Sequence, residues 1–227
     1  MPPECYNCLM DKHDGDTRRK KKLPDIIPVF PLAGVLLLPG CRLPLRIFEP
    51  RYVQMIEDAV DGERLVGMVQ PIDDDDRHEP ALQQVGCAGR IASIKQSDDG
   101  EYLISLVGVA RFEIREEMAS DQLYRLCEVR WDHQLARPAA DDSPVDREEL
   151  VANLRTYFDT HGLEANWRAI EESGDEELVN SLAMVCPFEP TEKQALLEAP
   201  DVAQRSRLVI ALMSMSVLPE QDTPRVH

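Results

Sequence analysis

The chain has 227 residues, 43% of them hydrophobic, enough for one large or two small domains with a buried core. Its net charge is −17. The first 22 residues hold six of the 25 basic side chains and four of the 42 acidic ones, so the rest of the chain carries 19 basic and 38 acidic side chains. This balance argues against nucleic-acid binding, which needs clustered cations. The longest apolar run, residues 208–213, is far below the ~20 residues of a membrane span.

We expect no membrane segment and no secretory signal, because prolines and an aspartate interrupt the apolar residues that follow the basic stretch 18–22. The expected compartment is therefore the cytoplasm. Four scattered cysteines are then predicted to be reduced, small, buried hydrophobes: Cys41, Cys87, Cys127 and Cys186.

Residues 1–23 are polar and aperiodic, which predicts a flexible tail. Cys5 and Cys8 are spaced like half of a zinc site, but no second Cys/His pair follows at finger-like spacing, so we assign no metal. The basic run at its end is typical of a solvated tail, with contact to RNA or an acidic partner as the alternative.

Short β-like runs begin at residue 26. Pro28 and Pro31 lack amide donors, so we expect the first strand at a sheet edge or barrel rim. A second strand is predicted over 43–48. Pro50 then opens a helix that ends at Asp61-Gly62 and carries one apolar stripe: Tyr52, Met55, Ile56, Ala59 and Val60.

A strand over 64–69 and a polar loop over 71–83 follow. The loop contains four consecutive aspartates, 73–76, which lack the alternate spacing of a calcium loop and predict a solvated acidic loop. Residues 85–96 and 102–115 flank an Asp-Gly turn and predict a hairpin, whose glycines suggest bulges in a curved barrel. The last predicted strand covers 124–131, and Ala110, Phe112 and Ile114 are expected to face inward while Arg111, Glu113 and Arg115 face outward.

Residues 133–142 mark a break in composition and predict a linker, after which the chain is helical. We expect a barrel subdomain over 24–133, a helical bundle over 143–218 and a disordered end over 219–227. The expected helices are one capped by Ser143-Pro144 and ended by His161-Gly162, a weak one over 163–171, one opened by a capping box at Ser173–Glu176 and stopped by Pro187, one over 191–198 and one opened at Asp201.

Catalytic patterns are missing from the sequence: it has no phosphate-binding GxxxxGK[ST], no GxSxG and no HExxH. The five histidines fall in predicted tails, loops or helix ends. Outside the tail the lysines are Lys95 and Lys193, both in polar surroundings where we expect solvation, so neither is predicted to activate a serine. We therefore predict no enzyme and no cofactor. A carboxylate ligand could be anchored by Arg42, Arg46, Arg51, Arg90 or Arg111, most of which also fit ordinary surface positions.

Three groups of residues resemble the amino-terminal domain of Lon-type proteases. The first runs from Phe30-Pro-Leu32 through Leu38-Pro-Gly40 to Leu43-Pro-Leu-Arg-Ile-Phe48-Glu-Pro-Arg51-Tyr52. The second is Val85–Ala92 with Gly108–Phe112, and the third is Leu178–Leu182 with Glu192–Glu198. The resemblance covers roughly residues 26–217. It implies an α+β fold, a PUA-like, mainly antiparallel β-barrel followed by a small α-helical bundle. It also implies a stand-alone form that lacks the ATPase and peptidase domains of that family.

The resemblance implies a non-catalytic module that binds unfolded or extended polypeptide, with a role in protein quality control and a separate protease as a possible partner. We expect the peptide at the barrel rim near Arg42, Phe48, Glu49, Arg51 and Tyr52, with pairing to an exposed strand edge. Phe48 and Tyr52 also fit plain core positions, and both interpretations stay open. An RNA-binding PUA-like protein is the alternative, and an enzyme on a small molecule is the third; no oligomeric state is assigned.

Overall fold

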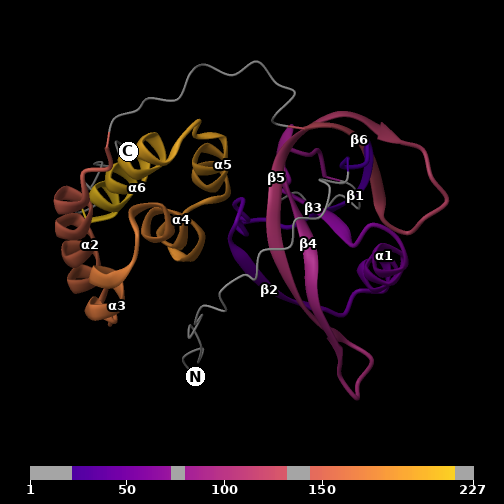
Figure 1. The fold of residues 1–227 in the computed structure, drawn as a ribbon, viewed down its shortest axis with the longest axis horizontal. Coiled ribbons are helices and arrows are strands. Elements are labelled where there is room, and N and C mark those ends of the chain that lie inside the picture. The colour runs from indigo at the N-terminus through magenta and orange to yellow at the C-terminus, as the bar shows by residue number, and fades with distance from the viewer. Residues whose placement is uncertain (1–21, 73–79, 132–143, 218–227) are drawn as a thin grey trace, which may run out of the picture.

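The computed structural model describes residues 22–72, 80–131 and 144–217. In these ranges the strands and α1 lie on one side of the molecule and the remaining helices on the other (Figure 1). The elements, in chain order, are β1 (Ile26–Pro31), β2 (Arg42–Ile47), α1 (Pro50–Asp61), β3 (Leu65–Val69), β4 (Val85–Gln96), β5 (Tyr102–Met118), β6 (Arg125–Trp131), α2 (Arg147–His161), α3 (Trp167–Glu172), α4 (Asp175–Val185), α5 (Pro190–Glu198) and α6 (Val202–Val217). The predicted α+β class is confirmed.

The sheet closes on itself. Its order is β2-β5-β4-β3-β1-β6, and β6 pairs again with β5, which is long enough to hold three neighbours. All these pairs are antiparallel except β1 with β3, as the prediction of a mainly antiparallel barrel requires. A Cβ at Gly86 would lie 2.4 Å from the ring of Phe112, so the glycine leaves room for that ring inside the closed sheet.

The prolines of β1 predict a sheet edge or a barrel rim, and the edge position is wrong, because β3 and β6 flank β1 on its two sides. The two ladders overlap only at Val29: Pro28 pairs within the β6 ladder and Pro31 within the β3 ladder. Each proline therefore has a strand neighbour on one side only, and a missing donor is tolerated there.

Two helix starts also differ from prediction. α2 begins at Arg147, with the side chain of Asp146 accepting from the backbone N–H of Glu149 (2.9 Å). The capping box at the start of α4 is wrong: Gly174 occupies the cap, and the hydroxyl of Ser173 instead donates to a carbonyl of α3 (2.8 Å). A capping box is found at α5, where the backbone N–H of Glu189 donates to the side chain of Glu192 (2.8 Å).

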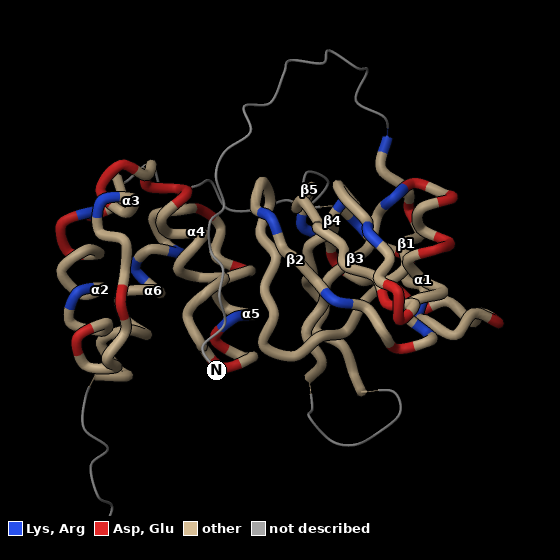
Figure 2. The backbone as a smooth tube through the Cα atoms, turned by 90° about the horizontal axis from the view of Figure 1, so that it is seen from below, with Lys and Arg blue, Asp and Glu red and all other residues tan. Residues whose placement is uncertain are grey.

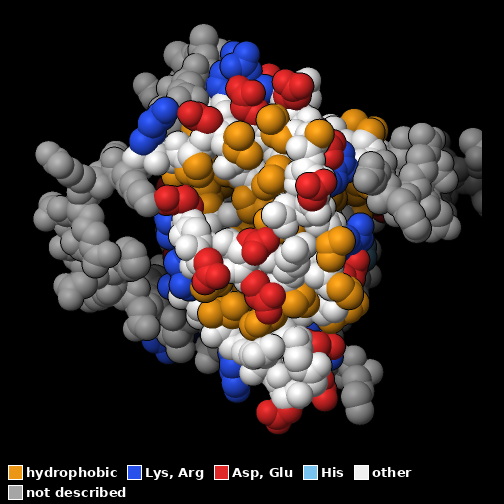
Figure 3. Space-filling model, turned by 90° about the vertical axis from the view of Figure 1, so that its right-hand side faces the viewer, with side chains coloured by type: hydrophobic (Ala, Val, Ile, Leu, Met, Phe, Trp, Pro, Cys, Tyr) orange, Lys and Arg blue, Asp and Glu red, His pale blue; other side chains and the backbone are white. Residues whose placement is uncertain are grey.

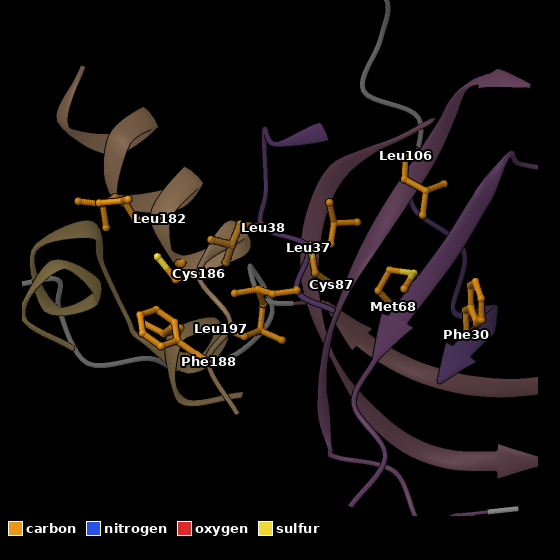
Figure 4. Close-up of a cluster of buried hydrophobic side chains, with 14 of the residues drawn as sticks. Phe30, Leu37, Leu38, Met68, Cys87, Leu106, Leu182, Cys186, Phe188 and Leu197 are labelled. Atoms are coloured by element: carbon orange, nitrogen blue, oxygen red, sulfur yellow. The ribbon is translucent and has the colours of Figure 1, made fainter. Parts of the chain in front are cut away.

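The buried side chains form two clusters. One fills the closed sheet around Phe112 and Trp131. The other runs from α1 over the outer face of the sheet and on to the bundle, through the buried segment 36–38 that precedes β2. In Figure 4, Leu37 and Leu38 lie between Leu182 of α4 and Met68 of β3. The sheet and the bundle thus share one apolar core.

Cys87, Cys127 and Cys186 are buried and Cys41 is half-buried, and all four are free thiols, which agrees with their predicted role as small hydrophobes. No helix in the described ranges is long and apolar enough to cross a membrane. The predictions on the tail, on Cys5 and Cys8, on aspartates 73–76, on the linker and on the chain end lie wholly or almost wholly outside the described residues.

Candidate functional site

The junction between β2 and α1 displays an exposed aromatic side chain beside an ion pair. Phe48 follows the last residue of β2 and is 62% exposed. Glu49 is the cap residue of α1, and Pro50 follows in the first turn, where a helix needs no amide donor. Arg51 reaches back to Glu49, with 2.8 Å between Nη2 and Oε2 and 3.0 Å between Nε and Oε2. Both charges are well exposed, so this pair orders the junction without adding much stability.

Tyr52 supports this junction from below. Its side chain is 6% exposed, and its ring lies 4.1 Å from that of Phe30. The guanidinium of Arg51 lies over the Tyr52 ring, 4.5 Å from its centre. Burial raises the pKa of Tyr52, so its hydroxyl keeps its proton. Phe48, Glu49 and Arg51 are therefore the surface of the junction, and Tyr52 is its base.

Arg42 does not join this group. It begins β2 and Phe48 follows the end of that strand, so about 20 Å of extended chain separates them. Arg46 pairs with Glu101 (2.5 Å), and Arg90 donates to the carbonyl of Glu63 (2.9 Å). All three arginines are exposed.

Arg111 lies on the outer face of the sheet, as the alternation of β5 predicts, but it is buried there and faces no open ligand surface. It is 7% exposed, and its Nη1 donates to the carbonyl oxygens of Leu197 (2.9 Å) and Ala199 (2.6 Å). The alternation of β5 correctly places Arg111 opposite the inner face, but α5 covers that outer face, which the strand pattern alone cannot show.

A shallow pocket of about 150 Å³ lies between α1 and the sheet. It is lined by β1, by Asp58 and Ala59 of α1, and by Tyr124. Tyr124 donates to Asp58 (2.9 Å), and burial together with this carboxylate raises the pKa of Tyr124 to about 12. The volume is below the ~300 Å³ of typical small-molecule sites, so this pocket does not suit a metabolite-sized substrate.

The face that carries α1 shows hydrophobic side chains interspersed with acidic ones (Figure 3). Exposed apolar residues of the sheet half include Phe48, Ile72 and Leu123, the last held beside α1 by a hydrogen bond from its backbone N–H to Gln54 (3.1 Å). Such a surface suits contact with another chain better than the enclosure of a small ligand.

Comparison with known families gives a match over most of the chain. The model of the ATP-dependent protease La (LON) substrate-binding domain matches residues 26–215. This chain belongs to that family. The match begins at β1 and ends within α6, so it covers both the sheet and the bundle.

Known Lon proteases align with this LON substrate-binding domain over most of its length. The Lon protease of Flavobacterium johnsoniae is 24% identical over 216 residues, which cover 92% of this chain and 26% of the relative. Lon protease 2 of Sorangium cellulosum is 28% identical over 204 residues, with 83% and 24% covered. The chain thus spans about a quarter of the length of the curated relatives it matches.

Two solved structures share the fold of the LON domain described here. A Lon N-terminal domain protein from Xanthomonas campestris has a TM-score of 0.57 at 24% identity, with 82% of this chain and 97% of that chain covered. The N-terminal domain of Lon protease from the Mycobacterium avium complex has a TM-score of 0.58 at 17% identity, covering 83% and 98%.

Lys193 of the LON domain is not the solvated lysine that its charged neighbours predict. It is 2% exposed, and burial lowers its pKa to about 8. Its Nζ donates to the carbonyl oxygens of Ala183 (2.9 Å) and Met184 (2.7 Å) at the end of α4. Within the described ranges these carbonyls, and no serine hydroxyl, are its hydrogen-bond partners, so its role is to cap a helix.

Lys95 is exposed, as predicted for a lysine near a hairpin turn. The described part of the LON domain contains no group of three or more His, Cys, Asp or Glu side chains that could hold a metal ion. The residues on this surface that are able to contact a ligand are therefore those of the junction and the exposed cations of the sheet.

Proposed function

We propose that this protein is a non-catalytic module that binds unfolded or extended polypeptide at the junction of Phe48, Glu49 and Arg51. The observation that carries the proposal is the 62% exposure of Phe48 beside a charged pair. The family description, a substrate-binding domain of an ATP-dependent protease, supports the same function.

The chemistry of an unfolded chain suits this junction. Unfolded polypeptide exposes apolar side chains that can pack on Phe48, and it carries charges of both signs that Arg51 and Glu49 can meet. Because binding relies on a surface and not on an enclosed cavity, many sequences can be accepted. We place the module in protein quality control, in the cytoplasm, with a protease acting on the bound chain.

The test is the affinity for fluorescein-labelled casein, an unfolded protein, measured by fluorescence anisotropy. We expect Phe48→Ala to weaken binding by roughly fivefold to thirtyfold, because it removes an aromatic contact that contributes about 1–2 kcal/mol to the binding free energy. Met215→Ala removes a side chain of similar exposure, 65%, from α6 and should leave the affinity unchanged. Equal affinities for wild type and Phe48→Ala would refute the site.

The same measurement is repeated with a single-stranded RNA of about 20 nucleotides. RNA binding without casein binding would instead establish the nucleic-acid alternative. Casein that is cleaved by the pure protein would refute the non-catalytic role.

A further inference from the structure

Exposed basic side chains of this acidic protein are mostly paired with carboxylates. In the described ranges the paired ones are Lys22, Arg46, Arg51, Arg115, Arg130, Arg155 and Arg168. Arg42, Arg90 and Lys95 have no ion-pair partner among the described residues, although acidic side chains are in excess. These three exposed cations are therefore available to an anionic ligand.

The sheet register brings these three cations to one face. Arg42 of β2 and Arg90 of β4 both stand opposite Val107 of β5. Residues directly opposite each other in an antiparallel sheet point to the same side, so both side chains leave the sheet on one face, from strands that lie about 10 Å apart across β5.

A second row repeats the arrangement. Arg46 of β2 and Lys95 of β4 both stand opposite Leu103 of β5, and Leu103 is 49% exposed. The two rows are separated by one row of small or cyclic side chains, Pro44 and Ser105 with Ser93. We call the set Arg42, Arg46, Arg90, Lys95, Leu103 and Val107 the cationic face.

β2 borders the cationic face and lies at one end of the sheet order, where β5 is its only strand neighbour among the described residues. The backbone N–H of Gly108 donates to the carbonyl of Cys41 (2.9 Å), which fixes the alternation along the strand. Arg42 and Arg46 therefore direct their N–H and C=O groups away from β5. Pro44 lacks a donor between them but keeps its carbonyl.

A strand added to this edge would place every second side chain on the cationic face. Positions four residues apart would stand opposite Arg42, which has no carboxylate partner among the described residues, and Arg46, which the ligand would share with Glu101. Figure 2 shows the two basic positions of β2 with no acidic position along the strand. The protein carries an excess of acidic side chains, which repel an anionic ligand, so among the described surfaces this group of basic side chains favours an acidic segment.

The geometry points to an extended acidic polypeptide segment as the ligand of the cationic face, added as a strand to β2, with Glu or Asp at positions four residues apart. This inference rests on the proposed polypeptide-binding function and names its substrate class. Nucleic acid is disfavoured because the face offers aliphatic side chains and no aromatic ring for base stacking.

The experiment uses the full chain and three labelled Val/Thr peptides of about ten residues, identical except for Glu, Gln or Lys at two positions four residues apart. We expect the Glu peptide to bind about fivefold tighter than the Gln peptide and the Lys peptide to bind weakest, since each exposed ion pair contributes little. Raising the salt concentration should remove the difference between the Glu and Gln peptides.

The variants localise the effect. The double variant Arg42→Gln, Lys95→Gln should lower the affinity for the Glu peptide to that for the Gln peptide. Arg168→Gln, which removes an exposed charge on α3, should not. N-methylation of alternate amides along one edge of the Glu peptide should abolish binding, and along the other edge should not, because a strand bonds through one edge only.

Equal affinities for the Glu and Gln peptides, or an unchanged affinity in the double variant, would overturn the inference while casein binding at Phe48 could still stand. Tighter binding of single-stranded RNA than of the Glu peptide, lost in the double variant, would overturn it in favour of a nucleic-acid face. Failure of both casein and the peptides to bind would refute the proposed function and this inference together.

Discussion

Lys193 carries its ammonium group at the carboxyl end of α4, bonded to two helix carbonyls. Burial lowers its pKa to about 8 from an ordinary value of 10.5. A neutral amine still has two N–H donors, so both bonds persist when the proton leaves. The free-energy cost of the buried charge therefore arises only while Lys193 is protonated.

Between about pH 8 and about pH 10.5 the unfolded chain holds this proton and the folded chain has released it, so Lys193 makes stability rise with pH. We predict that wild type gains roughly 2 kcal/mol relative to Lys193→Met from about pH 7.5 to about pH 9.5, measured by urea denaturation. Titration of groups common to both proteins largely cancels in this difference. Lys95→Met, which removes an exposed lysine, should show no such trend, and a pH-independent gap for Lys193→Met would contradict the assignment.

At the scale of elements, β5 and the segment before β2 meet at Gly108. The backbone N–H of Gly40 donates to the carbonyl of Gly108 (2.9 Å), and that of Gly108 donates to the carbonyl of Cys41 (2.9 Å). A Cβ on Gly108 would lie 2.1 Å from the carbonyl oxygen of Leu38, which is backbone and cannot rotate away. This close approach seats Leu37 and Leu38 in the shared core.

Gly108→Ala should therefore push the segment before β2 off the sheet and destabilise the fold by about 2–4 kcal/mol. This loss would be measured as a lower midpoint of unfolding in urea. Gly174→Ala is the matched control: its Cβ would meet nothing within 4 Å and its φ is −71°, so we expect a loss below ~1 kcal/mol. Equal losses in the two variants would show that Gly108 does not hold this contact.

The sequence predicts an element correctly where the signal, such as a turn or an apolar stripe, lies within or beside that element. The bounds of β4 and the Pro50 start of α1 follow from a turn signal and an apolar stripe in the sequence. The central place of β1, the burial of Arg111 and the burial of Lys193 depend on elements far along the chain, so nearby residues could not reveal them. For the same reason the sequence grouped Arg42 with Phe48, whereas the length of β2 separates them.

At the scale of the whole molecule, polar contacts cross the boundary between sheet and bundle inside a continuous apolar core. Arg111 of β5 donates to two carbonyls at the end of α5, and Gln194 Nε2 of α5 donates to the carbonyl of Val85 (3.1 Å). Separating the two halves would expose their shared apolar surface to water and exchange these hydrogen bonds for bonds to water. The sheet and the bundle should therefore not unfold independently.

The two tryptophans allow this cooperativity to be measured, because Trp131 lies in the sheet and Trp167 in the bundle. In Trp167→Phe, fluorescence reports on Trp131, which is 1% exposed, while circular dichroism at the helix band reports mainly on the bundle. We predict coincident urea midpoints for the two signals, as expected for one cooperative unit. Separated midpoints would mean that the contacts between the two halves stabilise the fold less than the contacts within each half. In that case the cationic face would keep its geometry without the bundle, since β2, β4 and β5 pair with one another directly.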